Sequence, residues 1–290
     1  MRPERAVISL ICIWCFLLWT AAPAKADETP VDLELVLAVD VSFSISRGEQ
    51  DIQRRGYANA FVNPDLVRAV TSGHHGRIAV TYLEWAGPAS QYQVVPWTVI
   101  DGPSSARAFA RTLREAPIRR GGETSISQAL ITAAGFFPYS SSPYVRRVID
   151  ISGDGPNNSG GGVVDAKRAV LARGITINGL PLIKSAGEPG SGIDMERYYR
   201  DCIIGGPGAF ALPVASWKTF ERTITRKLVT EVAGVSSMEA KVYLAAAGEK
   251  TDCLAGEKAE RDNYLRQLDD LTNGKSQRWR PRERDWPTPK

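Results

Sequence analysis

The feature that most constrains the fold is an apolar run that ends in a carboxylate. In LVLAVDVSFSIS the residues Leu35–Val39 are all apolar, Asp40 follows them, and serines then occupy positions 42, 44 and 46. A continuous apolar run of strand length is typical of the centre of a parallel sheet, where both faces are buried. We therefore predict a central strand over Leu33–Val41, with polar side chains at its carboxyl end.

The rest of the chain alternates between strand and helix patterns. Further strands are predicted at 77–87, 91–100, 144–155, 175–183 and 209–215, and helices at 46–62, 104–115, 125–137, 163–173, 195–203 and 217–233. This alternation predicts an α/β fold with a doubly wound, mostly parallel sheet and helices on both faces. The short Gly-Pro-Ala-Ser link at 87–90 favours a hairpin, so one antiparallel edge strand is expected.

Three residues are the expected ends of helices. Ser46 and Ser104 are predicted to be N-caps, because each has a hydroxyl just before a helical pattern. Gly174 is predicted to be the C-cap residue of the helix at 163–173.

The first 26 residues have the layout of a secretory signal peptide. Arg2 and Arg5 precede an apolar core at Ala6–Ala22, and Ala24-Lys25-Ala26 supplies a small-x-small cleavage pattern. The alternative is an uncleaved membrane anchor, because the apolar run is near the lower length limit for spanning a bilayer. The segment predicts a periplasmic or secreted protein whose domain occupies 27–235, with membrane contact only if the segment is uncleaved.

Residues 236–290 are predicted to be an extension of the domain. Weak helical patterns cover 236–247 and 257–271, and the last twenty residues contain six basic and two acidic side chains. We expect this basic end to be disordered. The net charge of +4 therefore comes from the ends of the chain and indicates no nucleic-acid partner.

Two cysteines, Cys202 and Cys253, follow the signal segment. Outside the cytoplasm two such cysteines either pair or remain separate thiols, and the sequence leaves both readings open. With His74-His75 they do not make a zinc site, and the histidine pair between glycines is expected to be an exposed turn.

Oxygen-bearing side chains gather in three loops at predicted strand or helix ends. These are Asp40–Ser44, Gly122–Ser125 and Ser152–Gly155, and none contains sulfur or imidazole. In open α/β sheets ligands bind beyond the carboxyl ends of the strands. Oxygen-only sets suit hard cations such as Mg²⁺, Ca²⁺ and Mn²⁺. Alternation along the first loop predicts that Asp40, Ser42 and Ser44 converge, while Val41 and Phe43 face the packed side.

Each of these residues also has an ordinary structural interpretation. Ser42 and Ser44 are candidate helix caps, as are Thr124 and Ser125. Asp154 and Asn157 are candidates for an Asx turn. Their coincidence in three loops nevertheless favours a shared site.

The chain resembles a von Willebrand factor A-type domain with a metal-ion-dependent adhesion site. That motif is Asp-x-Ser-x-Ser, then a Thr on a second loop and an Asp on a third. The matching residues are Asp40, Ser42, Ser44, Thr124 and Asp154. The resemblance covers Val31–Gly234. The segment YYRDCIIGGPGAF at 198–210, with the signal peptide, also resembles a branch of secreted bacterial proteins of unknown function that carry this domain.

The resemblance implies a divalent cation, Mg²⁺ first and Mn²⁺ or Ca²⁺ next, held by both serine hydroxyls. Thr124 would bind directly or through water, and Asp40 and Asp154 mainly through water. A Glu or Asp of a partner protein would complete the site. Neutral hydroxyls leave a dication electrophilic, which agrees with this use. Glu123, Asn157 and Asn158 are expected around the site.

The sequence therefore predicts a protein-binding module rather than an enzyme. It lacks a phosphate-binding Gly-x-x-x-x-Gly-Lys-Ser/Thr loop and a Gly-x-Ser-x-Gly elbow. Two alternatives are a metal-dependent phosphohydrolase with Asp40 as its nucleophile and a structural module with a vestigial site. The phosphohydrolase would usually have a second acid where Ser42 stands.

Overall fold

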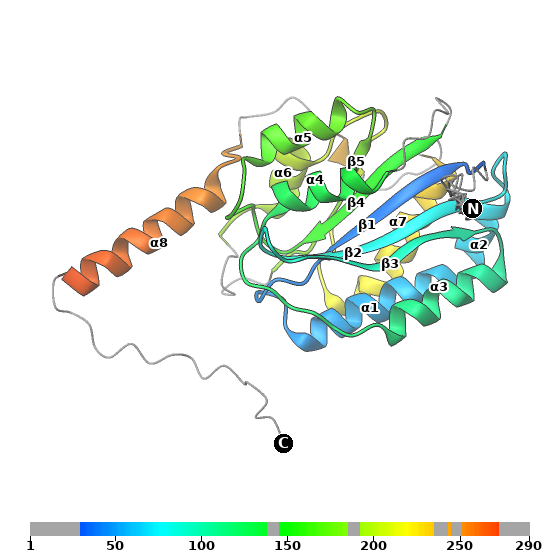
Figure 1. The fold of residues 1–290 in the computed structure, drawn as a ribbon, viewed down its shortest axis with the longest axis horizontal. Helices are drawn as coiled ribbons and strands as arrows, with labels where there is room; N and C mark the ends of the chain where they lie inside the picture. Colours follow the sequence, from blue (N-terminus) through cyan, green and yellow to red (C-terminus); the bar gives the residue numbers. More distant parts are fainter. Residues whose placement is uncertain (1–29, 138–144, 185–191, 235–242, 245–250, 273–290) are drawn as a thin grey trace, which may run out of the picture.

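The computed structural model describes residues 30–137, 145–184, 192–234, 243–244 and 251–272. A seven-stranded sheet in the order β3-β2-β1-β4-β5-β6-β7 lies between two layers of helices (Figure 1). The strands are β1 (Leu33–Asp40), β2 (Ile78–Trp85), β3 (Gln91–Ile100), β4 (Arg146–Gly153), β5 (Thr176–Pro181), β6 (Phe210–Ala211) and β7 (Tyr243–Leu244). The helices are α1 (Arg47–Val62), α2 (Pro64–Thr71), α3 (Pro103–Glu115), α4 (Ile126–Phe136), α5 (Val163–Leu171), α6 (Met195–Tyr198), α7 (Phe220–Ala233) and α8 (Ala255–Thr272). Short η1 (Tyr199–Ile203) and η2 (Trp217–Thr219) turns precede β6 and α7.

Strand β1 is the centre of the sheet, as its sequence predicts. All eight of its residues are buried, and it pairs in parallel with β2 on one side and β4 on the other. From β1 the chain continues to β2 and β3 on one side, and later elements fill the other side. The strand order therefore reverses between β1 and β4, and their carboxyl ends form the usual ligand-binding position of such sheets.

Alternate residues of β1 enter two different cores. Leu35 and Leu37 belong to a core covered by α1, α2, α3 and α7, whereas Val36 and Ala38 belong to a core covered by α4, α5 and α6. This is the period-two alternation of a strand that is buried on both faces. Each fully buried large side chain contributes about 1.5–3 kcal/mol, so β1 is firmly fixed.

The predicted fold class is confirmed, with β3 antiparallel to β2 at one edge. Helix α2 was not predicted, because Asn63-Pro64 directly follows the helical pattern at 46–62 and a proline usually ends a helix. The same pair starts α2, since the Asn63 side chain accepts a hydrogen bond from Asp65 N and Pro64 occupies the first turn.

Of the three predicted helix ends, only Ser46 is confirmed. Its side chain accepts from Glu49 N, and Glu49 bonds back to Ser46 N in a capping box. The prediction for Ser104 is wrong, because α3 starts at Pro103 with Gly102 as N-cap. Gly174 is not the C-cap either: α5 is capped by Ala172, and Gly174 turns the chain with a φ of 70° two residues later.

The C-terminal extension differs in part from its prediction. The predicted helix at 236–247 is wrong at residues 243–244, which form β7 antiparallel to β6 at the second edge of the sheet. The predicted helix at 257–271 is confirmed as α8, which projects from the body (Figure 1). The signal segment and the basic end lie outside the described residues. Among the described residues, no helix is long and apolar enough to cross a membrane.

The two cysteines form a disulfide, which decides between the two readings of the sequence. Cys202 in η1 and Cys253 just before α8 are bonded, with their Cα atoms 5.6 Å apart. The bond therefore ties the C-terminal extension to the body of the domain.

Candidate functional site

The three predicted loops meet at the carboxyl ends of β1 and β4. Ser42, just after β1, forms a parallel bridge with Gly121 at the start of the second loop. Asn158, just after the third loop, donates its backbone N–H to the carbonyl of Thr124 at 2.9 Å. The loops thus form one contiguous surface, as the sheet topology predicts.

Four of the five predicted side chains form one hydrogen-bonded chain. Oδ1 of Asp40 accepts from the backbone N–H of Ser42 at 2.7 Å. The hydroxyl oxygens of Ser42 and Ser44 lie 2.8 Å apart. The Ser44 hydroxyl donates to Oδ1 of Asp154 at 2.7 Å. The predicted convergence of the first loop on the third is therefore observed.

The prediction for the intervening residues is half wrong. Val41 is buried, but the Phe43 side chain is 62% exposed. Arg120 explains this placement: its guanidinium lies 5.1 Å from the Phe43 ring centre and donates to the carbonyls of Phe43 and Ile45. An exposed aromatic ring therefore stands beside the hydroxyl groups of the site.

Asp40 is the most unusual residue of the cluster. Its side chain is fully buried, and its Oδ2 atom has no hydrogen-bond partner. Burial, reinforced by the nearby Asp154 carboxylate, raises the pKa of Asp40 to about 8. Gly153 permits this arrangement, because a Cβ at that position would lie 3.0 Å from Oδ2. An unpartnered buried carboxylate oxygen is costly unless something positive binds it.

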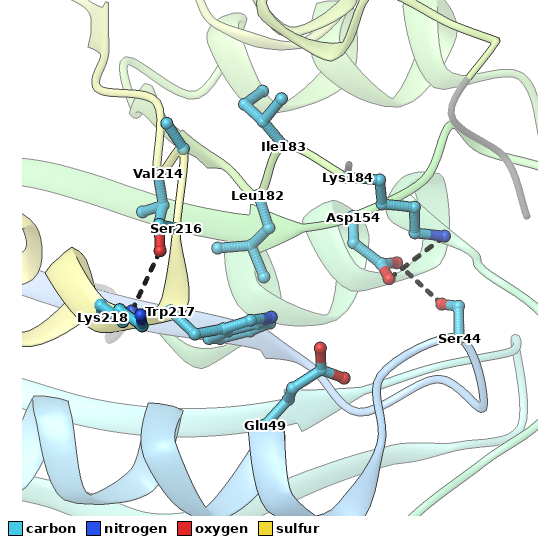
Figure 2. A pocket seen from close by; sticks show the side chains of 11 residues that line it. Ser44, Glu49, Asp154, Leu182, Ile183, Lys184, Val214, Ser216, Trp217 and Lys218 are labelled. Carbon is cyan, nitrogen blue, oxygen red and sulfur yellow. Dashed lines mark hydrogen bonds and ion pairs between the residues drawn. The ribbon is translucent and has the colours of Figure 1, made fainter. Parts of the chain in front are cut away.

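Asp154 has a basic neighbour that the sequence did not predict. Its Oδ2 lies 3.3 Å from Nζ of Lys184, and both side chains are largely buried. Figure 2 shows Ser44 and Lys184 approaching the Asp154 carboxylate from opposite elements. Lys184 follows β5, thirty residues after Asp154 in the sequence, and no local pattern links the two residues.

Thr124 is joined through its backbone to Asn158, four residues after Asp154. It is 6% exposed, and its N–H donates to Oδ1 of Asn158 at 2.7 Å. The preceding residue, Glu123, has a φ of 63°, and its carboxylate accepts from the hydroxyl of Ser159 at 3.1 Å. Asn158 therefore joins the loop of Thr124 to the loop of Asp154.

The ordinary structural interpretation is confirmed for Ser125, which caps α4, but not for Ser42, Ser44, Thr124 or Asp154. The N-cap of α1 is Ser46, so neither Ser42 nor Ser44 is that cap. The N-cap of α4 is Ser125, so Thr124 is not that cap. The Asp154 carboxylate contacts Ser44 and Lys184, which lie on other loops, and this differs from an Asx turn.

A cleft of about 300 Å³ opens beside Ser44 and Asp154. Figure 2 shows its wall, where the indole of Trp217 lies across from Leu182 and Glu49. Its full lining is Ser44, Glu49, Asp154, Leu182, Ile183, Lys184, Val214, Ala215, Ser216, Trp217 and Lys218. The cleft thus combines an apolar wall with two ammonium groups next to the predicted site.

The residues present fit a divalent cation by their chemistry. All candidate ligand atoms are oxygens, and the buried Asp40 Oδ2 is unpartnered. Within the described part of the chain, no group of three or more His, Cys, Asp or Glu residues is placed to hold a metal. The predicted set contains only two acids and relies on hydroxyl groups, so it is not a cluster of that kind.

Comparison with solved structures places the fold. Proximal thread matrix protein 1 from the mussel byssus, with a zinc-occupied MIDAS motif, is 15% identical, with a TM-score of 0.51 over 70% of this chain and 48% of that chain. The pilus adhesin SpaC from Lactobacillus rhamnosus GG, in its open conformation, is 12% identical, with a TM-score of 0.52 over 70% of this chain and 30% of that chain. The chain thus spans less than half of either protein. At these identities the likeness shows the fold alone.

The predicted resemblance to von Willebrand factor A-type domains is confirmed at the level of the fold. No curated protein matches the chain. One protein family matches residues 30–236, which is most of the chain. The chain therefore belongs to the family described as "Protein of unknown function (DUF1194)".

Proposed function

We propose that this protein is an extracytoplasmic, adhesion-type module that binds a partner protein through a divalent cation. Asp40, Ser42, Ser44, Thr124 and Asp154 would hold the ion. The observation that carries the proposal is the fully buried Asp40 carboxylate, whose Oδ2 has no hydrogen-bond partner. A second carboxylate, Asp154, lies nearby and is joined to the same loop through the hydroxyl groups of Ser42 and Ser44. Such an arrangement is stabilised by a bound cation.

The chemistry of the site favours a hard cation, with Mg²⁺ first and Mn²⁺ or Ca²⁺ as alternatives. Hydroxyl and carboxylate oxygens are the ligands these ions prefer. The similar mussel protein has zinc in its MIDAS motif, so zinc belongs in the same test. When bound, the ion would act as a Lewis acid toward an incoming oxygen ligand.

The surroundings of the site support protein binding by an acidic residue. The five candidate residues include only two carboxylates, and Lys184 and Lys218 add positive charge to the adjoining cleft. Phe43 stands exposed beside the hydroxyl groups, which is typical of the aromatic anchors of protein interfaces. A Glu or Asp next to an apolar side chain would therefore suit both features.

The same geometry supports a non-enzymatic role. A phosphohydrolase nucleophile has to reach its substrate, but the Asp40 side chain is fully buried and Oδ1 is engaged by Ser42 N–H. The proteins of similar fold include an adhesin and a matrix protein, which agrees with binding. The disulfide and the predicted signal peptide support a location outside the cytoplasm.

The metal site is tested by titrating the purified protein with Mg²⁺, Mn²⁺ and Zn²⁺ beside Asp40→Ala and Ser42→Ala. We expect both variants to lose at least tenfold in affinity. Ser46→Ala is the matched control, because Ser46 continues the same row of serines but caps α1. Equal metal binding by all four proteins would refute the site.

Partner binding is tested separately with Phe43→Ala. This variant keeps all five candidate ligands, so we expect unchanged metal affinity and reduced capture of the partner from envelope extract. Wild type should release that partner in chelator. Capture that survives both chelator and Asp40→Ala would contradict metal-dependent adhesion.

A further inference from the structure

The segment just before and at the start of α8 lies against the loop that follows Asp154. The family match ends at residue 236, so this segment belongs to the extension beyond it. The Cys202–Cys253 disulfide spans 51 residues and anchors the segment to η1. Arg197 and Asp201 add side-chain bonds to Thr251 on the same segment.

Gly256 makes the closest approach between the two segments. It is buried, and a Cβ at this position would lie 2.1 Å from the carbonyl oxygen of Asn157 and 3.0 Å from the Pro156 ring. Backbone atoms do not yield to such an overlap, so only glycine fits here. The extension is therefore packed directly on the main chain of the Asp154 loop.

Glu257 completes the contact with a side-chain bond. Its Oε1 accepts from Nδ2 of Asn157 at 2.7 Å, and its Oε2 is buried without a hydrogen-bond partner. Since Asn157 is itself fully buried, loss of this acceptor would leave an amide hydrogen less well satisfied.

Asn157 also makes hydrogen bonds that connect this contact to the elements around the predicted metal-binding loops. Its Oδ1 accepts from Ser127 N at the start of α4 at 2.9 Å, and its N–H donates to the hydroxyl of Tyr198 at 3.1 Å. The next residue, Asn158, donates its backbone N–H to the carbonyl of Thr124 and accepts from the Thr124 N–H through its Oδ1. Two consecutive asparagines therefore join the Asp154 loop, the Thr124 loop and the extension.

We propose that Gly256 and Glu257 are positioning residues of the metal site, held in place by the Cys202–Cys253 disulfide. This inference rests on the proposed function, because it concerns the same site. The extension packs on Asn157, and the hydrogen bonds of Asn157 and Asn158 connect the Asp154 loop with Ser127 and Thr124. Reduction of the disulfide would release the segment and loosen both loops at once.

Two readouts test the proposal on the full mature chain. The first is hydrogen exchange in chelator, which follows the amides of Ser127, Thr124 and Asn158 without any metal. The second is Mn²⁺ affinity. The variants are Gly256→Ala, Glu257→Ala and the double change Cys202→Ser with Cys253→Ser, each checked for folding by circular dichroism.

We expect faster exchange at these amides and about tenfold weaker Mn²⁺ binding in all three variants, as for outer-sphere partners of metal ligands. Glu257→Gln should restore both properties, because its amide oxygen still accepts from Asn157. Glu260→Gln, one turn further along on the exposed part of α8, is the matched control.

Folded variants with unchanged exchange and affinity would overturn the proposal, and so would a fall in overall stability without either change. If wild type and Asp40→Ala bind no metal but exchange still responds, the proposed function fails while the positioning role stands. Retained exchange protection with lost affinity in Gly256→Ala would place its effect elsewhere and refute positioning through Asn157.

Discussion

Two buried aspartates on neighbouring strands of the sheet differ in the charge of their nearest ionisable neighbour. Asp150, in the middle of β4, is fully buried with Nζ of Lys227 at 2.6 Å, and Lys227 also contacts Glu231 at 3.0 Å. Asp40, at the end of β1, is equally buried, but the charged group that acts on it is another carboxylate, that of Asp154. The first aspartate therefore has one of the protein's own cations beside it, whereas the second has a like charge.

The difference between the two clusters teaches what each is for. A lysine on a helix is a permanent counter-ion, and with Asn178 donating to Glu231 it fixes α7 against β4 and β5. A position without such a lysine is open to a cation that exchanges with solvent. The same burial thus gives a structural joint in one place and a candidate binding site in the other.

We call Asp150, Lys227 and Glu231 the closed cluster. Removing its lysine should have the largest effect. Lys227→Met leaves Asp150 and Glu231 buried without their cation, and we expect a loss of about 3–5 kcal/mol in the free energy of unfolding. Urea unfolding measures it, with the exposed Lys218→Met as control. A loss below about 1 kcal/mol would show that the closed cluster is not held by this charge.

We call Asp40, Ser42, Ser44 and Asp154 the open cluster. A substitution there should change the stability with the opposite sign. Asp40→Asn keeps an acceptor for Ser42 N–H but removes the buried carboxyl group, so the metal-free protein should gain about 1–3 kcal/mol in stability. Wild type should be stabilised by Mg²⁺ and the variant should not. Thermal melts in chelator and in Mg²⁺ measure both effects, and a destabilised variant in chelator would contradict the comparison.

The open cluster was predictable from sequence because its chemistry is local. Asp40, Ser42 and Ser44 sit within five residues of a recognisable strand end, and glycines mark the other loops. The closed cluster gave weaker signals. Asp150 interrupts the apolar run 148–151 of β4, and Lys227 falls on the same face of α7 as Ile224, yet neither residue indicates its partner.

Long-range placement explains the remaining differences. Lys184, Gly256 and Glu257 reach the site from segments far along the chain, and only the folded topology brings them there. Phe43 looked buried by alternation, but that rule ends where the strand ends, and Arg120 then holds the ring at the surface. Sequence patterns therefore predicted the hydrogen-bonded centre of the candidate site better than its surroundings.

The pH dependence of the free energy of unfolding provides a third and smaller effect. Burial raises the pKa of Asp150 from 3.8 to about 7, despite the opposing influence of Lys227. Between these values the folded protein keeps a proton that the unfolded chain has lost, so this contribution to stability is present at low pH and is lost as the pH rises through about 7. We expect Asp150→Asn to flatten the pH dependence by about 1 kcal/mol per pH unit. Urea unfolding in chelator at several pH values tests this, and an unchanged slope would contradict it.

The smallest expected effect probes whether the open cluster is truly free of a built-in cation. Lys184 Nζ lies 3.3 Å from Asp154 Oδ2, so Lys184 is a partial counter-ion of Asp154 as Lys227 is of Asp150. An ammonium group at this position repels a dication and competes for the same carboxylate. Lys184→Met should therefore strengthen Mn²⁺ binding about threefold to tenfold, or about 1 kcal/mol. Lys218→Met is the control, because Lys218 lines the same cleft but is exposed. Weaker Mn²⁺ binding in Lys184→Met would mean that the lysine holds the Asp154 loop in place for the metal instead of competing with it, and the contrast between the two clusters would then be one of degree.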